Sequence, residues 1–430
     1  MTDALAPNAP KRVPIPKNGV DYRGKIVLAP MVRSGELPSR LLALKYGADL
    51  VWGPETIDKA LIGTTRRINT IANTIEWTRY PSSYLRDVEN GVTPSPDVNA
   101  SVIYRLHPEK ERGKLIFQIG TAKPEHAVEA ARLVAADVAG IDVNAGCPKP
   151  FSTTGGMGAA LLQTPDRLVS ILEALVREVG REFEIGISVK IRLLETPEKT
   201  ESLVRRLVGT GITGLTVHCR TTPMRPRERA IREQLKMIVG VCEEAGVACL
   251  MNGDVTGKDE AIQLMQEYGA DGAMIATAAE KNSSCFRSQA DGGLVGWEQI
   301  VREYVELCLE VENRWGNTKY LLGQLIPGKE GCYRPMNQSK GYEDMVKALR
   351  FDDLIEKARH VDQRLNIKPA ESKAVKKAKR KEALAGKGEG KGKDENMDAK
   401  RVKMGVEPQQ PLRHILEGVQ EVPGAVQLSV

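Results

Sequence analysis

The residues best suited to chemistry lie between positions 140 and 162, where a cysteine follows the end of an apolar run. Residues 141–143 have the apolar character of a buried strand end. Cys147 comes after a turn of small residues, and Pro148 restricts the backbone on both sides of the bond that joins them. A single cysteine is more often a small buried apolar residue than a reactive one. The rigid turn, with Asn144 before Cys147 and a glycine-rich stretch after it, favours a chemical role here.

The glycine-rich stretch contains Gly155, Gly156 and Gly158, and an Ala/Leu-rich segment follows it. We expect that segment to be a helix whose first N–H groups face an anion or a flat ring, because glycine lets a backbone approach a ligand closely. The reaction would then take place between this loop and whatever lies opposite Cys147.

A repeated alternation of apolar runs and helical patterns positions the cysteine. The apolar runs predict strands at 25–28, 48–52, 115–119, 140–144, 186–191, 214–218, 247–252 and 272–276. Helical spacing predicts helices between them, at 37–46, 124–136, 166–179, 199–210, 231–245 and 258–268. Eight such units over about 260 residues predict a (β/α)8 TIM barrel. An open doubly wound sheet is the alternative, but it calls for a G-x-G-x-x-G turn after the first strand, which is missing there.

Polar or reactive residues stand at nearly every predicted strand end, where such barrels carry their active sites. These residues are Met31, Glu55, Gln118, Asn144 with Cys147, Lys190, His218, Asn252 and Thr277. A lysine at the mouth of a barrel core usually needs an anionic or hydrogen-bonding partner. Lys190 or His218 alone could be structural, but the pair on adjacent strands favours a site.

The regions outside the barrel differ in composition. We expect residues 1–24 to be a disordered leader and residues 25–290 to form the barrel, with an insertion at 56–114 that contains a hairpin of residues 74–79 and 101–106. Residues 291–367 have helical patterns and predict a small all-helical domain. Residues 368–430 are a lysine-rich, low-complexity tail that cannot build a core, and we expect it to be disordered.

Charge and cysteine usage narrow the function classes. The chain has a net charge of +6, of which residues 368–403 contribute +7 and the rest −1. The seven cysteines show no C-x-x-C spacing, which argues against a disulfide framework or a zinc site and for a reducing compartment. No apolar run is long enough for a membrane span, and residues 1–10 do not resemble a secretory signal. We therefore expect a monomer in the cytoplasm, the nucleus or both, with no metal and no membrane contact.

The strand-end motifs together resemble the tRNA-dihydrouridine synthases, flavin enzymes that reduce specific uridines in tRNA. The motifs are Ala29-Pro30-Met31-Val32, Phe117-Gln118-Ile119-Gly120, Asn144-Ala145-Gly146-Cys147-Pro148, Val189-Lys190-Ile191-Arg192, Val217-His218 with Arg220-Thr221, and Asn252-Gly253-Asp254. Two longer runs, residues 152–162 and Asn317-Thr318-Lys319-Tyr320, are most similar to the eukaryotic branch, which modifies uridine 20 of the D-loop. The resemblance extends from about residue 25 to residue 365.

This resemblance implies an FMN-binding barrel followed by a helical tRNA-binding domain, with NAD(P)H as the electron donor. It implies that Cys147 is the proton donor. The residues that it assigns to the flavin are Pro30, Met31, Val32, Gln118, Lys190 and His218 for the ring, and Asn252, Gly253, Asp254, Ala276 and Thr277 for the phosphate. The sequence departs from the family at Thr277, where an arginine is usual, so a phosphate contact there would come from the backbone.

The chemistry of uracil agrees with these roles. The C5–C6 bond is conjugated to the C4 carbonyl, so hydride can add at C6 while a proton is delivered to C5. A thiol of ordinary pKa, about 8.5, is mostly protonated at neutral pH, so Cys147 can act as an acid. Two other functions remain open: an FMN barrel that acts on a small conjugated substrate, and a tRNA-binding protein without catalysis. The basic tail favours an RNA partner, although a nuclear-localisation signal or a solubilising end would have the same composition.

Overall fold

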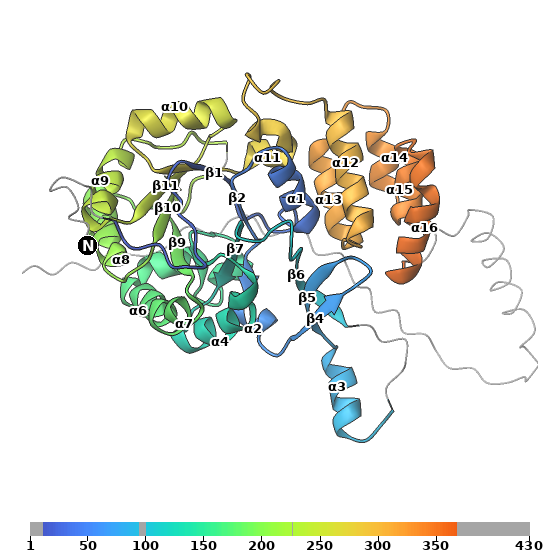
Figure 1. Cartoon of the computed structure of the whole chain (residues 1–430), viewed down its shortest axis with the longest axis horizontal. Coiled ribbons are helices and arrows are strands. Elements are labelled where there is room, and N and C mark those ends of the chain that lie inside the picture. Colours follow the sequence, from blue (N-terminus) through green and yellow to red (C-terminus); the bar gives the residue numbers. More distant parts are fainter. Residues whose placement is uncertain (1–11, 94–99, 226, 368–430) are drawn as a thin grey trace, which may run out of the picture. The chain divides into compact units, whose positions relative to one another are not determined.

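Eight parallel strands close into a barrel (Figure 1). A computed structural model of the chain describes residues 12–93, 100–225 and 227–367. The barrel strands are β1 (Lys25–Leu28), β2 (Leu50–Trp52), β7 (Leu115–Gly120), β8 (Gly140–Ala145), β9 (Gly186–Leu193), β10 (Gly214–Thr221), β11 (Ala248–Asn252) and β12 (Gly272–Ile275). They pair in the order β2-β1-β12-β11-β10-β9-β8-β7, and β2 also pairs with β7 to complete the ring. The predicted TIM barrel is confirmed, and the open sheet is excluded.

The helices between the strands begin and end where local chemistry predicts. A proline opens α4, α6 and α8, since its fixed φ suits a first helical turn in which its missing N–H has no helical partner. Gly246 and Gly269 end α9 and α10 with left-handed backbone angles. The helices of the barrel are α1 (Leu37–Lys45), α4 (Pro124–Val134), α6 (Pro165–Leu175), α7 (Arg181–Phe183), α8 (Pro197–Val208), α9 (Leu235–Ala245), α10 (Lys258–Tyr268) and α11 (Thr277–Lys281).

Two of these helices are shorter than predicted. The helix expected at 166–179 ends as α6 at Leu175 and continues as a π-helical turn over 176–180. The helix expected at 231–245 begins only at Leu235, because Ile231 donates its backbone N–H to Cys219 of β10 instead of starting the helix. Neither change moves a strand end.

Residues 12–24 correct the prediction of a disordered leader that extends to residue 24. The backbone N–H of Val13 donates to Gly246, and Tyr22 is only 1% exposed. The Tyr22 ring fills the barrel end at which the strands begin, where a Cβ on Gly214 would lie 2.5 Å from it. Glycine at the start of that strand is therefore required by the packing of Tyr22. Residues 1–11 lie outside the described part of the chain.

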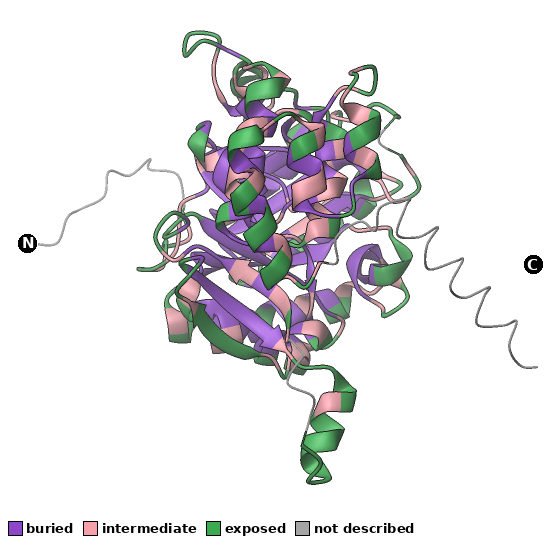
Figure 2. Ribbon diagram, turned by 90° about the vertical axis from the view of Figure 1, so that its right-hand side faces the viewer, coloured by how far each residue is buried: buried purple, intermediate pink, exposed green. Residues whose placement is uncertain are grey.

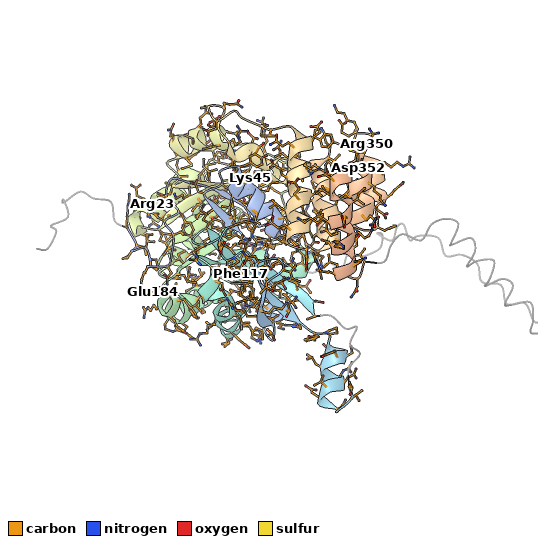
Figure 3. All side chains as sticks on the ribbon, turned by 45° about the vertical axis from the view of Figure 1, so that its right-hand side comes forward. Arg23, Lys45, Phe117, Glu184, Arg350 and Asp352 are labelled. Carbon is orange, nitrogen blue, oxygen red and sulfur yellow. The ribbon has the colours of Figure 1, made fainter. Side chains whose placement is uncertain are left out.

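The insertion at 56–114 contains more structure than the predicted hairpin. The expected pair, β5 (Thr74–Arg79) and β6 (Ser101–Leu106), is antiparallel as predicted, and β4 (Thr65–Asn69) adds a third strand on the other edge of β5. The insertion also holds β3 (Thr56–Ile57), α2 (Asp58–Leu61) and α3 (Ser82–Glu89). Figure 2 shows the barrel strands buried, whereas α3 has no buried residue. The insertion packs on the barrel through Tyr104, whose ring meets that of Phe117 in β7 edge-on, with ring centroids 4.8 Å apart. Phe117 is labelled in Figure 3.

Five helices follow the barrel, as predicted: α12 (Trp297–Glu310), α13 (Trp315–Leu325), α14 (Tyr333–Gln338), α15 (Tyr342–Ala348) and α16 (Ile355–Arg364). Their apolar cluster includes Leu42 and Tyr46 of α1, so this helical region shares a core with the barrel. The boundaries predicted for the two domains remain a prediction. No helix in the described ranges is long and apolar enough to cross a bilayer. The predicted tail, residues 368–430, lies outside those ranges.

The motif at 317–320 joins the helical region to the barrel. Asn317 donates from Nδ2 to Glu36 at 2.5 Å, and the Arg33 guanidinium lies 4.2 Å from the Tyr320 ring centroid. Thr318 is buried between Asn313 and Tyr342, at 2.9 and 2.8 Å. Glu36 and Arg33 follow β1 directly. This run therefore fixes the helical region against the loop after the first barrel strand.

Candidate active site

Polar side chains line one half of the barrel interior. Side chains alternate along a strand, so every second residue of β7 to β10 faces inward. The polar residues at these positions include Gln118, Asp142, Asn144, Ser188, Lys190 and His218. Most interior positions of β1, β2, β11 and β12 are apolar and form a separate buried cluster with Tyr22, whereas Asn252 at the end of β11 is polar. The site therefore belongs to one side of the barrel mouth.

A chain of hydrogen bonds crosses the inner face from β9 to β7. Ser188 donates to one oxygen of Asp142 at 2.7 Å, and Gln118 donates from Nε2 to the other at 2.8 Å. Asn144 in turn donates to Oε1 of Gln118 at 3.2 Å. These bonds fix which end of the Gln118 amide is nitrogen, and one of its N–H groups is left to donate to a ligand. Burial raises the pKa of Asp142 to about 6.

Lys190 lies beside this chain on β9, three residues before the strand ends. Its register partner on β8 is Asn144, and the ionisable groups close enough to act on its ammonium include Arg192, Asp142, Cys219 and Cys147. Burial, followed by the charge of Arg192, lowers the pKa of Lys190 to about 8, while Asp142 opposes that shift. Lys190 is therefore a cation at neutral pH that loses its proton more readily than a surface lysine.

His218 on the next strand is uncharged. Burial, with the charges of Lys190, Arg192 and Arg220, lowers its pKa to about 2. Arg220 lies 3.2 Å from Nε2, and a guanidinium can only donate, so Nε2 is the acceptor and the proton is on Nδ1. The His218 ring therefore presents an Nδ1–H donor. Arg220 itself is held by Asp254, at 2.5 Å.

The residues assigned to a phosphate lie at the ends of β11 and β12. Asn252 donates to the Met274 carbonyl at 2.8 Å, which ties the two strand ends together. Gly253 has a φ of +121°, and a Cβ there would lie 3.4 Å from the His218 ring. The Asp254 carboxylate binds Arg220 and the Ala230 N–H. A contact between Asp254 and a phosphate would therefore come from its backbone. Ala276 and Thr277 open the five-residue α11 with Thr277 exposed, and their part in binding a phosphate stays a prediction.

The turn that carries Cys147 is held by Asn144 and Arg192. Asn144 Oδ1 accepts the backbone N–H groups of Gly146 and Cys147, both at 3.0 Å. Arg192 donates from Nε to the Gly146 carbonyl at 2.8 Å. Asn144 and Lys190 are register partners, so this turn brings Cys147 to the same end of the barrel as Lys190. The sequence predicted a rigid turn, and the structure confirms it.

The segment after Cys147 differs from the predicted helix. Pro150–Thr153 forms a short helix, α5, and the Ala/Leu-rich run Gly158–Gln163 is a 3-10 helix. The reason is at Gly158, where a Cβ would lie 2.4 Å from the Ser152 hydroxyl and 2.6 Å from the Cys147 carbonyl. The segment folds back on the Cys147 turn instead of running away from it.

Pro30, Met31 and Val32 form an open turn after β1. Pro30 and Met31 are half-buried and Val32 is 45% exposed. The Met31 carbonyl accepts from Gly35 at 2.7 Å, and Arg33 adopts a φ of +73°. Their backbone is therefore accessible beside the barrel mouth, and their contact with a flavin stays a prediction.

Three polar residues of the site went unrecognised as functional in the sequence. Asp142 and Ser188 each occupy the position two residues before a predicted site residue on the same strand, and this period of two was a signal that could have found them. No such signal marked Ser152, because it lies in the loop after Cys147 and reaches the site only where that loop folds back on the Cys147 turn. In the described part of the chain, no three His, Cys, Asp or Glu side chains form a group that could hold a metal ion.

The sequence pattern of a known family, described as dihydrouridine synthase (Dus), matches residues 89–380. The chain belongs to this family. A relative from Schizosaccharomyces pombe named tRNA-dihydrouridine(20) synthase [NAD(P)+] is 49% identical over 338 residues, which are 77% of this chain and 66% of the relative. The protein of the same name from Saccharomyces cerevisiae is 43% identical over 77% of this chain and 84% of its own length. A mouse protein named tRNA-dihydrouridine(20a/20b) synthase [NAD(P)+]-like is 27% identical over 66% of this chain and 75% of its own. The predicted family is confirmed.

Proposed function

We propose that this chain is a flavin-dependent tRNA-dihydrouridine synthase that reduces uridine 20 of the D-loop with NAD(P)H. The observation that carries the proposal is the thiol of Cys147 at the mouth of a barrel that belongs to the dihydrouridine synthase family. The two relatives at 49% and 43% identity, whose names specify position 20, support the choice of that uridine over 20a or 20b.

The residues at the mouth fit FMN. Three donors stand on the same part of the barrel wall, on β7, β9 and β10: one N–H of Gln118, the Lys190 ammonium and the Nδ1–H of His218. They suit the acceptor atoms along one edge of an isoalloxazine ring. Gly253, next to His218, leaves the end of β11 without a Cβ, as a phosphate approached through its backbone requires. The reduced flavin supplies the hydride for C6 of uridine.

Cys147 delivers the proton. Burial, and then the nearby charge of Glu55, raises the pKa of the thiol, so it is protonated at neutral pH. As the new C5–H bond forms, the S–H bond breaks and its electron pair stays on sulfur. The Lys190 ammonium lies close to Cys147 and stabilises the thiolate that remains. A proton from solvent then restores the thiol.

A tRNA substrate suits the surface beside this site. A cavity of about 540 Å³ lies between the insertion and the helical region, and its walls include the exposed Arg67, Tyr80 and Arg314 together with Trp315. Guanidinium groups bind phosphates, and aromatic rings stack on bases that have left their helix. The target uridine must leave the folded tRNA to reach the barrel mouth.

The direct test is to map dihydrouridine in unmodified tRNA after incubation with the purified protein and NADPH. We expect the modification at position 20, in a protein that carries the visible absorption of an oxidised flavin. A coloured protein that leaves tRNA unmodified but oxidises NADPH with small enones would support the alternative substrate class. A colourless protein that binds tRNA would support a role without catalysis.

A further inference from the structure

Glu55 stands next to the proposed acid and is so far without a role. It follows β2 in the run Gly53-Pro54-Glu55 and precedes β3, which pairs with β7. Its side chain is 9% exposed. Ser152 donates to Oε1 at 2.8 Å, whereas Oε2 is buried and has no hydrogen bond in the described part of the chain. A buried carboxyl oxygen that accepts no hydrogen bond lowers the stability of the folded protein, so the presence of Glu55 at this position calls for a functional reason.

The fold makes room for this carboxyl group at two glycines. A Cβ on Gly120, at the end of β7, would lie 2.6 Å from Glu55 Oε1. A Cβ on Gly158 would lie 2.4 Å from the hydroxyl of Ser152, which holds the same oxygen. The Cys147 carbonyl is fixed in turn by the Ala159 N–H at 2.9 Å. Three segments therefore meet around the carboxyl group, and a side chain at Gly120 or Gly158 would collide with this arrangement.

The carboxyl group faces the thiol. Cys147, Asn144 and Ser152 are the polar side chains that approach Glu55, and Cys147 alone among them ionises. Cys147 is also near the cations Lys190 and Arg192. Two cations favour a thiolate, and one carboxylate opposes it. Burial and the charge at Glu55 both raise the pKa of the Cys147 thiol, so Glu55 adds to burial in opposing these cations.

We propose that Glu55 is a positioning residue that keeps Cys147 protonated and orients its thiol for proton donation. This inference rests on the proposed function, in which Cys147 is an acid. Lys190 and Arg192 stabilise the thiolate after proton transfer, and Glu55 adds to the effect of burial in keeping the thiol protonated before it. Glu55 thus favours the thiol form of Cys147, which can act as an acid, over the reactive thiolate that nearby lysine and arginine side chains favour.

Thiol alkylation tests the inference without tRNA or turnover. Glu55→Gln keeps the size of the side chain and removes its charge. Iodoacetamide labels the thiolate, and peptide mass spectrometry separates Cys147 from Cys332, the other cysteine that is not buried. We expect the pH midpoint of Cys147 labelling to fall by about one unit, which is about tenfold more thiolate at a given pH below both midpoints. An unchanged midpoint in the folded variant overturns the inference.

Two further variants serve as a control for nearby charge and as a second test of Glu55. Asp58→Asn removes a buried carboxylate three residues away that binds Thr121 and the Lys59 N–H, and it should leave the midpoint in place. An equal shift in this control would overturn the inference, since any nearby charge would then act alike. Ser152→Ala frees the Glu55 carboxyl and keeps its charge, so it carries the test if Glu55→Gln does not fold. A midpoint that falls supports the inference, because loss of the Ser152 contact with the thiol itself would raise the midpoint; an unchanged or raised midpoint overturns it.

The activity profile tells this inference apart from the proposed function. In single-turnover reduction of tRNA, Glu55→Gln should lower the pH at which activity falls by the same amount as the labelling midpoint. A shift in labelling without a shift in activity overturns the role of Glu55 in proton donation. If Cys147→Ala reduces tRNA normally, the proposed acid is wrong, whatever the labelling of Cys147 shows.

Discussion

At the scale of single residues, the thiol of Cys147 carries the first prediction. Cys147→Ala should keep the flavin but slow the reduction of uridine by about 10²–10⁴-fold, the usual loss for a general acid. Its backbone contacts with Asn144 and Ala159 do not involve the thiol, so the turn should persist. The rate is measured in a single turnover with pre-reduced enzyme. Cys332→Ala, which changes the other partly exposed cysteine, is the control and should behave as wild type.

A second residue-scale prediction concerns His218 and acid. Its pKa is lowered from 6.5 to about 2 in the folded chain, so below pH 6.5 the unfolded chain binds a proton that the folded chain does not. Stability contributed by the neutral ring is thus lost as the pH falls through this window. Between pH 7 and pH 5 the loss amounts to about 2 kcal/mol.

Urea unfolding at the two pH values checks this. His218→Gln should lose about 2 kcal/mol less than wild type on going from pH 7 to pH 5, since the other titrating groups are common to both proteins. Equal losses would mean that His218 is protonated in the folded protein, and the Nδ1–H assignment would then be wrong.

Thr277 tests where a phosphate lies. Thr277→Arg places a guanidinium at the exposed start of α11, beside the ends of β11 and β12. If the FMN phosphate sits there, the variant should hold the cofactor by about 1 kcal/mol more tightly, or about fivefold in Kd, a modest gain because the position is exposed. Dialysis followed by flavin fluorescence measures it. Weaker or unchanged retention would place the phosphate elsewhere.

At the scale of elements, the insertion and the helical region face one cavity and should act together on tRNA. Arg67 comes from β4 of the insertion, where its guanidinium also pairs with the buried Glu76, and Arg314 comes from the turn before α13. Arg67→Ala and Arg314→Ala should each raise the KM for tRNA about fivefold with little change in kcat, since a partly exposed phosphate contact contributes about 1 kcal/mol.

Arg177→Ala provides the matched control. This exposed arginine lies in the π-helical turn after α6, where its guanidinium pairs with Glu178. The KM for tRNA should not change. Were kcat to fall in Arg67→Ala or Arg314→Ala instead of KM rising, the cavity would serve the reaction and not the RNA.

At the scale of the whole molecule, charge is divided unevenly along the chain. Residues 368–403 hold thirteen Lys/Arg and six Asp/Glu, while the remainder has a net charge of −1. We expect this segment to tether tRNA without sequence preference. Deleting residues 368–430 should weaken tRNA binding and flatten its salt dependence by several logarithmic units, since each phosphate neutralised contributes slightly less than one. Turnover at saturating tRNA should stay similar.

A full-length chain with those thirteen basic residues changed to glutamine separates charge from length. It should match the truncated chain in its salt slope. If both variants keep the slope of wild type, the tether is excluded, and a nuclear-localisation signal at residues 376–381 would remain as the explanation of the charge.

The sequence by itself determined the barrel, its strand ends and its family. Apolar runs of strand length that alternate with helical spacing leave few arrangements other than β/α repeats, and proline and glycine mark where helices begin and end. The residues at the strand ends followed, because a barrel brings all its carboxyl ends to one face. Gln118, Lys190 and His218 could be chosen in this way without any contact being known.

Contacts between distant segments were decided only by the tertiary structure. β4 has the exposed, polar sequence Thr-Arg-Arg-Ile-Asn and is a strand because β5 pairs with it. The sequence predicted that Tyr22 belongs to a disordered leader, whereas in the structure strands that begin with glycine enclose its ring. Glu55 and Ser152 are 97 residues apart and meet at Cys147 only because β2 and β7 are neighbours and the loop after Cys147 folds back. The periodicity of a sequence indicates which face of a helix or strand is buried. Which segment covers that face depends on how the strands close into the barrel.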